Sequence, residues 1–170
     1  MAQFDLYIPL LFRLEGRLGL VTNHPTDKGG LTNAGVTIKT FRQFFGQDRT
    51  ADDLRNMTYE QWYRIMKSYW DDCKGDRIRN QSIAELVVDW NINSGITGMK
   101  EAQRCLNLVA DGVYGPKTLT ALNSDPQKCV FCRIMDARKA FFKRLASASP
   151  SQAANLNGWL NRLKNFDYEP

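Results

Sequence analysis

The segment LEGRLGLVTNHPTDKGGLTNAGVT, residues 14–37, follows an apolar stretch and contains few side chains suited to a core. Within residues 4–15, apolar side chains recur three and four positions apart, which is typical of an amphipathic helix ending near Glu15 and Gly16. The polar, glycine-rich residues that follow favour a loop, and residues 18–36 hold the only strands we expect. We therefore predict a mainly α (α+β) fold with one small β-hairpin.

The rest of the chain is predicted to be helical. Thr58 with Gln61, and Ser82 with Glu85, have the spacing of capping boxes, and we expect the second of these helices to stop at Gly95. The sequence ADGVYG, residues 110–115, indicates a turn between two helices. Further helices are predicted up to residue 106, from residue 116, from about residue 126 to 145, and around residues 156–163.

Composition and charge narrow the class of protein. The 170 residues are 43% hydrophobic and 24% charged, as in a folded domain, and no run approaches the roughly 20 apolar residues of a membrane span. The net charge of +5 favours polyanionic partners, but the scattered basic residues are more typical of a solvated face than of a nucleic-acid site. We expect a monomer made in the cytoplasm without a signal peptide, with no nucleic-acid partner and no integral membrane association.

The four cysteines, Cys73, Cys105, Cys129 and Cys132, include one CxxC pair. Structural zinc sites usually combine two close ligand pairs on turns, whereas this pair falls in a helical pattern and the other two cysteines are distant in sequence. We therefore interpret all four as buried, reduced thiols, and we expect no metal and no cofactor.

Glu15 is the candidate for chemistry in the opening segment. A carboxyl group at a helix C-terminus faces the negative end of the helix dipole, which raises its pKa and favours the protonated form that a general acid needs. Gly29, Gly30 and Gly35 allow a ligand to approach the backbone, and Thr32 and Asn33 add small polar groups. On spacing alone, the same residues favour an ordinary helix end followed by a turn.

From the segment around Glu15 onward, the chain resembles glycoside hydrolase family 108, the lysozyme-like N-acetylmuramidases of phages, prophages and bacteria. The family's opening motif resembles E-G-G-Y-V-N-D-P-A-D-P-G-G-x-T-x-x-G, and this chain has Glu15-Gly16, Asn23, Pro25, Asp27, Gly29-Gly30, Thr32, Asn33 and Gly35. Further similarity lies in SYWDD (68–72), VVDWNINSG (87–95), LNLVADGVYGPKTLTAL (106–122) and NGWLNRL (157–163). One departure is Arg17, which stands where the family has its second glycine, and three extra residues separate Glu15 from Asp27.

The resemblance implies a single lysozyme-like domain over residues 1–170, with a catalytic part (1–97) and a peptidoglycan-binding-like helical part packed on it (98–170), and a hairpin beside the active-site cleft. It implies cleavage of the β-1,4 bond between N-acetylmuramic acid and N-acetylglucosamine, with Glu15 as general acid. By a broader similarity to phage lysozymes, Asp27 is the charge stabiliser or base and Thr32 positions water. The glycan strands of peptidoglycan are the expected partner.

The expected substrate contacts are Gly30, Asn33, Tyr69, Trp70 and Asn93. Trp70 lies off the apolar stripe of its helix, which favours it among the tryptophans as a sugar-stacking residue, although aromatic residues at helical spacing usually belong to the core. Asn93 is suited to bind an N-acetyl group or to cap a helix. His24, the one histidine, is expected on the surface.

Two alternatives remain open at the level of sequence. The first is a peptidoglycan-binding or secretion-helper protein that keeps the fold without catalysis, and the second is a chitinase-like glycosidase. As a peptidoglycan hydrolase, the protein is expected to act on the cell wall after export or lysis.

Overall fold

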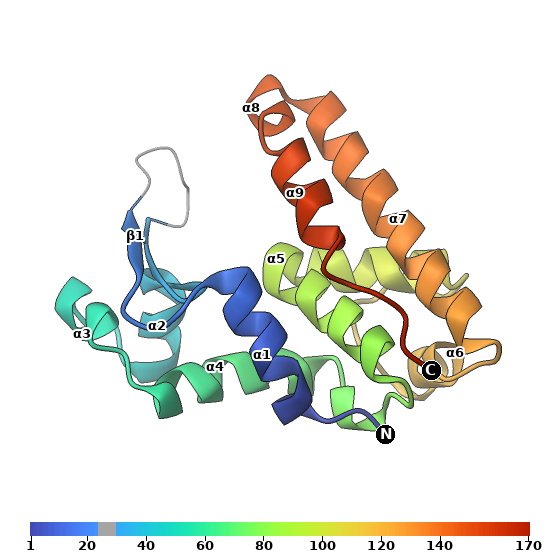
Figure 1. The fold of residues 1–170 in the computed structure, drawn as a ribbon, viewed down its shortest axis with the longest axis horizontal. Helices are drawn as coiled ribbons and strands as arrows, with labels where there is room; N and C mark the ends of the chain where they lie inside the picture. The colour runs from blue at the N-terminus through green and yellow to red at the C-terminus, as the bar shows by residue number, and fades with distance from the viewer. Residues whose placement is uncertain (24–29) are drawn as a thin grey trace. The chain divides into compact units, whose positions relative to one another are not determined.

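The computed structural model describes residues 1–23 and 30–170 and is mainly helical, as predicted (Figure 1). The small β-element is confirmed, but it has three strands where we expected one hairpin. The strands are β1 (Val21–Asn23), β2 (Leu31–Asn33) and β3 (Val36–Thr37), and a short 3-10 helix, η1, spans Gly75–Arg77. The α-helices in the described part of the chain are α1 (Phe4–Glu15), α2 (Ile38–Phe45), α3 (Ala51–Arg55), α4 (Tyr59–Asp72), α5 (Gln81–Cys105), α6 (Pro116–Leu122), α7 (Gln127–Ala148), α8 (Pro150–Ala153) and α9 (Leu156–Leu163).

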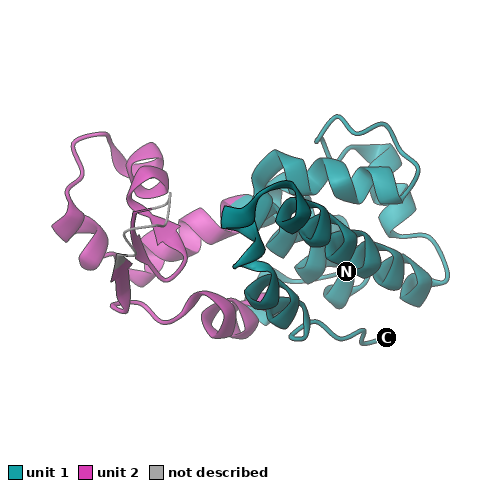
Figure 2. Cartoon of the chain, turned by 90° about the horizontal axis from the view of Figure 1, so that it is seen from above, with its two compact units in different colours: residues 1–6, 69–170 teal, residues 7–68 magenta. Residues whose placement is uncertain are grey.

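The chain forms two compact units (Figure 2). Unit 2 comprises residues 7–68, and unit 1 comprises residues 1–6 and 69–170. The division expected from the sequence, between residues 97 and 98, lies within α5, which belongs to unit 1, and it stays a prediction.

Unit 2 contains the sheet, whose strands are antiparallel in the order β1-β2-β3. Ala34 and Gly35 connect β2 to β3 with φ of 46° and 79°, the two positive φ angles that a type I′ turn requires. The register places three threonines side by side on one face, and the opposite face carries buried side chains from the two strands that flank the turn. The threonines are Thr22, Thr32 and Thr37, and the buried residues are Asn33 and Val36.

Two helix starts test the capping predictions. The capping box at α4 is confirmed, since the Thr58 backbone N–H donates to Gln61 Oε1 at 3.0 Å and the Gln61 N–H donates to Thr58 Oγ1 at 3.3 Å. The box predicted at Ser82 is wrong by two residues, because Asn80 caps α5 by accepting the Ile83 N–H at 3.0 Å. Gly95 interrupts α5 with φ 55° and ψ −146°, so the predicted stop is a kink within a longer helix.

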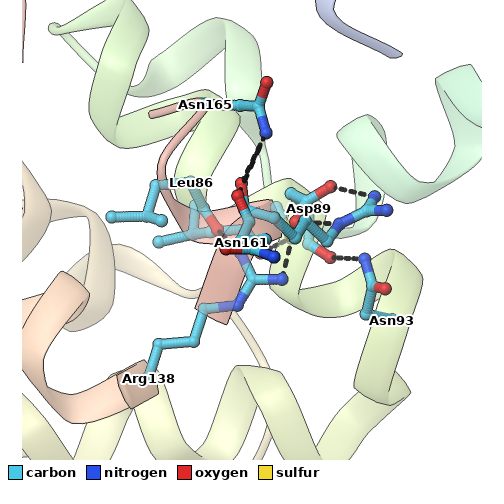
Figure 3. A network of polar contacts seen from close by, with 9 residues as sticks. Leu86, Asp89, Asn93, Arg138, Asn161 and Asn165 are labelled. Carbon is cyan, nitrogen blue, oxygen red and sulfur yellow. Dashed lines mark hydrogen bonds and ion pairs between the residues drawn. The ribbon is translucent and has the colours of Figure 1, made fainter. Parts of the chain in front are cut away.

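Unit 1 is built around a buried ion-pair cluster between α5, α7 and α9 (Figure 3). Asp89 on α5 is fully buried and accepts hydrogen bonds from Arg138 on α7 and Arg162 on α9, each at 2.6 Å. Burial alone raises the pKa of Asp89, but the two guanidiniums outweigh that effect and hold the pKa below its ordinary value. The cluster therefore connects α5 to two helices whose arginines lie 49 and 73 residues after Asp89 in the sequence.

The cysteines are all free, as expected, but they are not all buried. Cys73 is buried and Cys105 is half-buried, whereas Cys129 and Cys132 are exposed on α7. The expectation of four buried thiols is thus wrong for the CxxC pair, because both residues lie on the solvent face of their helix.

Candidate active site

Glu15 is the last residue of α1, and its side chain is half-buried. The helix ends there because Gly16 takes φ of 85°, a left-handed conformation that favours glycine, while its N–H still donates to the Phe12 carbonyl at 3.1 Å. The Glu-Gly pair therefore places a carboxylic acid at a helix C-terminus, where the sequence predicted it.

The turn between β2 and β3 lies directly against the Glu15 carboxyl group. A Cβ atom added to Gly35 would lie 2.6 Å from Glu15 Oε2 and 2.9 Å from both Glu15 Cβ and Cδ. These separations are shorter than any ordinary van der Waals contact, so only a glycine fits between the turn and the acid. Gly35 is thus required both by its positive φ and by its closeness to Glu15.

Trp62 on α4 fixes the turn and the helix that carries Glu15. Its buried indole Nε1 donates to the Ala34 carbonyl at 3.0 Å, and its ring stacks on Phe12 of α1 with centroids 4.3 Å apart and an interplanar angle of 13°. Phe12 lies three residues before Glu15, so one side chain sets the turn and the acid relative to each other. The sequence showed Trp62 only as part of an apolar stripe, and no local signal indicates this bond.

Asn33, predicted to contact substrate, is fully buried behind the sheet. Its Oδ1 accepts the Gly19 N–H at 3.0 Å, and its Nδ2 donates to the carbonyls of Leu54 at 2.8 Å and Arg55 at 3.3 Å. A side chain without exposed surface offers nothing to a ligand in this conformation. Asn33 therefore connects the loop after Glu15 to the C-terminus of α3 and positions the hairpin.

Thr32 and Gly30 lie at the start of β2, and both are half-buried. The Thr32 hydroxyl donates to the Gly30 carbonyl at 3.1 Å, so its oxygen retains two lone pairs that can accept a hydrogen bond. The predicted second carboxylate, Asp27, and the lone histidine, His24, lie outside the described residues.

The other predicted substrate contacts, Tyr69, Trp70 and Asn93, belong to unit 1. Trp70 is a core residue, because it has no exposed surface, its Nε1 donates to Asp76 Oδ1 at 2.6 Å, and Gly75 packs on its ring. The prediction that its indole stacks on a sugar thus conflicts with its burial.

Tyr69 and Asn93 retain surface. Tyr69 is half-buried, and Asn93 is exposed with its Nδ2 donating to the Asp89 carbonyl at 2.8 Å. That bond runs back one turn within α5, which continues past Asn93 to Cys105, so the contact of Asn93 with substrate stays a prediction. Of the remaining tryptophans, Trp90 is fully buried and Trp159 is half-buried and stacks on Phe142 at 5.2 Å.

The ADGVYG turn of unit 1 is organised by Gln103, which is 1% exposed. Its Oε1 accepts the Gly112 N–H at 2.8 Å, and its Nε2 donates to Asp111 Oδ1 at 2.8 Å and to the Val113 carbonyl at 3.0 Å. The motif residues Asp111 and Gly112 therefore hold a loop conformation, and the motif alone is no sign of a ligand contact.

Residues 1–23 and 30–170 contain no group of three or more His, Cys, Asp or Glu placed to hold a metal ion. Among the helices of that same part, none combines the length and the apolar character that a membrane crossing needs.

Comparison with known proteins identifies the class. Residues 8–95, which include α1, the sheet and the Glu15 site, match the family described as Glycosyl hydrolase 108. Residues 97–164 match a second family, described as Predicted Peptidoglycan domain. The chain belongs to glycosyl hydrolase family 108 and is a glycoside hydrolase by membership, with a peptidoglycan-domain segment at its C-terminal end.

The chain is also similar to a solved structure. The structure of Brucella abortus SagA is similar to this chain with a TM-score of 0.82 and 27% sequence identity, over 95% of this chain and 89% of that one. A search of curated proteins finds no match to the sequence.

Proposed function

We propose that this protein is a peptidoglycan hydrolase of the N-acetylmuramidase type, which cleaves the β-1,4 bond between N-acetylmuramic acid and N-acetylglucosamine. The observation that carries the proposal is the Glu15 carboxyl group, half-buried at the end of α1 with the Gly35 backbone directly against it. Membership of glycosyl hydrolase family 108 supports the reaction type, and the peptidoglycan-domain segment supports the polymer.

Glu15 acts in this proposal as the general acid, which protonates the glycosidic oxygen as the bond breaks. Such a group must keep one orientation, because a proton is transferred only across hydrogen-bonding distance. The stack of Phe12 on Trp62 and the Trp62 bond to Ala34 support this role, because they restrain the end of α1 and the β2–β3 turn next to Glu15.

Two further residues complete the proposed chemistry. Glycoside hydrolysis usually needs a second carboxylate that activates water or stabilises the developing positive charge, and Asp27 is the proposed group. The Thr32 hydroxyl already donates to the Gly30 carbonyl, so its lone pairs are available to orient a water molecule. Tyr69 and Asn93, which retain exposed surface, stay proposed contacts to the glycan.

The test is the release of reducing ends from purified sacculi by the wild type and by Glu15→Gln, with mass analysis of the soluble products. Glu60→Gln is the matched control, because it makes the same change at an exposed carboxylate in the first turn of α4, within the same unit. We expect Glu15→Gln to be roughly a hundredfold slower than the wild type, and Glu60→Gln to match it.

The products decide between the proposed enzyme and its alternatives. Muramic acid at the new reducing ends supports the muramidase, whereas N-acetylglucosamine at those ends contradicts the bond assignment. Preferential cleavage of chitin oligomers would show a chitinase-like enzyme. If the wild type sediments with sacculi and releases no reducing ends, the protein is a wall-binding protein and the proposal fails.

A further inference from the structure

The net positive charge of the chain lies in its last helices, because acidic residues are scarce there. Residues 127–164, which include α7, α8 and α9, contain eight Lys or Arg residues and one acidic residue, Asp136. The resulting net charge of +7 exceeds the +5 of the entire chain, so the remaining residues are net negative. This region is part of the segment that matches the peptidoglycan domain.

Helices α7 and α9 lie side by side in unit 1 (Figure 1), and a groove of about 500 Å³ lies along this pair. Its lining combines apolar and basic side chains without an acidic one among them. The apolar lining residues are Phe131, Met135, Leu160, Leu163 and Phe166, and the basic ones are Lys139, Lys143 and Lys164.

The three lysines are exposed and only lightly paired. Lys139 lies 3.6 Å from Asp136, whose side chain is itself 77% exposed, and Lys164 donates to the neutral Asn161 side chain at 2.9 Å. Within the described part of the chain, Lys143 has no ion-pair partner. The groove thus presents ammonium groups beside an apolar surface, which suits a ligand with carboxylates and small apolar side chains.

We propose that the α7–α9 groove binds the acidic peptide stem of peptidoglycan. Stem peptides combine several free carboxylates with alanine methyl groups, so their chemistry complements both the lysines and the apolar lining. This inference rests on the proposed function, because it assumes that peptidoglycan is the polymer on which the enzyme acts. The groove would hold the wall through its peptides while the Glu15 site acts on the glycan.

The test measures the affinity of the full chain for a synthetic stem tetrapeptide by calorimetry, and locates the contact from amide shifts in NMR spectra. The groove variant replaces Lys139, Lys143 and Lys164 by Gln. Three surface ion pairs contribute modestly, so we expect its affinity to be roughly tenfold weaker than that of the wild type. The wild-type affinity should also fall as salt rises from about 50 to 500 mM.

Two controls make the result specific. A second triple variant replaces Lys39, Lys117 and Lys128, which are exposed and lie outside the groove, by Gln, so it loses the same net charge. We expect it to bind like the wild type. A stem peptide with amidated carboxylates should bind as weakly to the wild type as the free peptide binds to the groove variant.

Equal weakening in both triple variants would overturn the proposal, as would wild-type binding without amide shifts along α7 and α9. Binding to vesicles of anionic phospholipid through the groove lysines, without binding to the stem peptide, would show a membrane surface as the occupant and also overturn it. Because the peptide contains no glycosidic bond, failure here leaves the muramidase reaction intact. Conversely, an inactive chain that binds the peptide would contradict the enzyme and support the groove.

Discussion

Replacing Gly35 by Ala should damage the proposed active site through a single methyl group. The new Cβ would lie 2.6 Å from Glu15 Oε2 and 2.9 Å from Glu15 Cδ, compared with an ordinary separation of about 3.5 Å. Relief of these contacts requires the carboxyl group or the turn to move by about 0.6–0.9 Å. The bond from Trp62 to Ala34 and its stack on Phe12 restrain the turn, so we expect the acid to move.

Two effects of Gly35→Ala have different magnitudes and different readouts. The positive φ of 79° costs an L-residue about 1–2 kcal/mol, and the crowding adds about 1–3 kcal/mol, so the free energy of unfolding should fall by about 2–5 kcal/mol. A displacement approaching 1 Å at a reacting group lowers rates by roughly a hundredfold. Activity should therefore fall much further than the folded fraction does.

Gly19→Ala is the matched control, since Gly19 has φ of 86° but no atom within 4 Å of an added Cβ. It should lose about 1–2 kcal/mol of stability and keep its rate within about twofold. Denaturant unfolding and reducing-end release, measured at a temperature where both variants are folded, separate the two effects. If Gly35→Ala releases reducing ends at the wild-type rate, or if Gly19→Ala slows that release as much as Gly35→Ala does, the closeness of the turn to Glu15 does not matter for catalysis.

Two further predictions concern unit 1. Asp89→Asn should reduce the free energy of unfolding by about 3–5 kcal/mol near neutral pH, because it leaves buried guanidinium charge uncompensated. Since folding lowers the pKa of Asp89, the stabilisation is complete above the unfolded pKa of about 3.9 and is lost as the pH falls through the folded value. The difference in free energy of unfolding between the wild type and Asp89→Asn, measured by urea unfolding, should therefore be constant above about pH 5 and become smaller below pH 4. A difference that stays constant over the whole pH range would refute this. In the native protein, maleimide should label Cys129 and Cys132 quickly and Cys73 only on unfolding, because burial raises the pKa of the Cys73 thiol; equal labelling by mass spectrometry would contradict the burial.

The parts of the fold that could be predicted from sequence depend on local interactions. Helix α1 and the Thr58–Gln61 capping box were predictable because their signals lie within four residues of each other. Ser82 shows the limit of such signals, because its hydroxyl accepts the Glu169 N–H, 87 residues away, and leaves the cap of α5 to Asn80. Helix α3 has only five residues, too few for a periodic pattern.

The same difference between local and long-range interactions decides which features of the candidate site could be predicted. The place of Glu15 at a helix end followed by Gly16 could be predicted, because both features are local. The burial of Trp70 could not, because Phe4 and Gly75 cover its ring from other elements. Likewise, the tertiary bonds of Asn33 to Leu54 and Arg55 assign it a positioning role that no spacing in the sequence indicates.

The central claim is that Glu15 is the general acid of a peptidoglycan hydrolase. The most direct measurement compares the initial rates at which the wild type and Glu15→Gln release reducing ends from the same sacculi. A ratio of roughly one hundred or more, with muramic acid at the new ends, is the predicted result. Equal rates in the two proteins would contradict the assignment of the acid and remove the basis of the proposed mechanism.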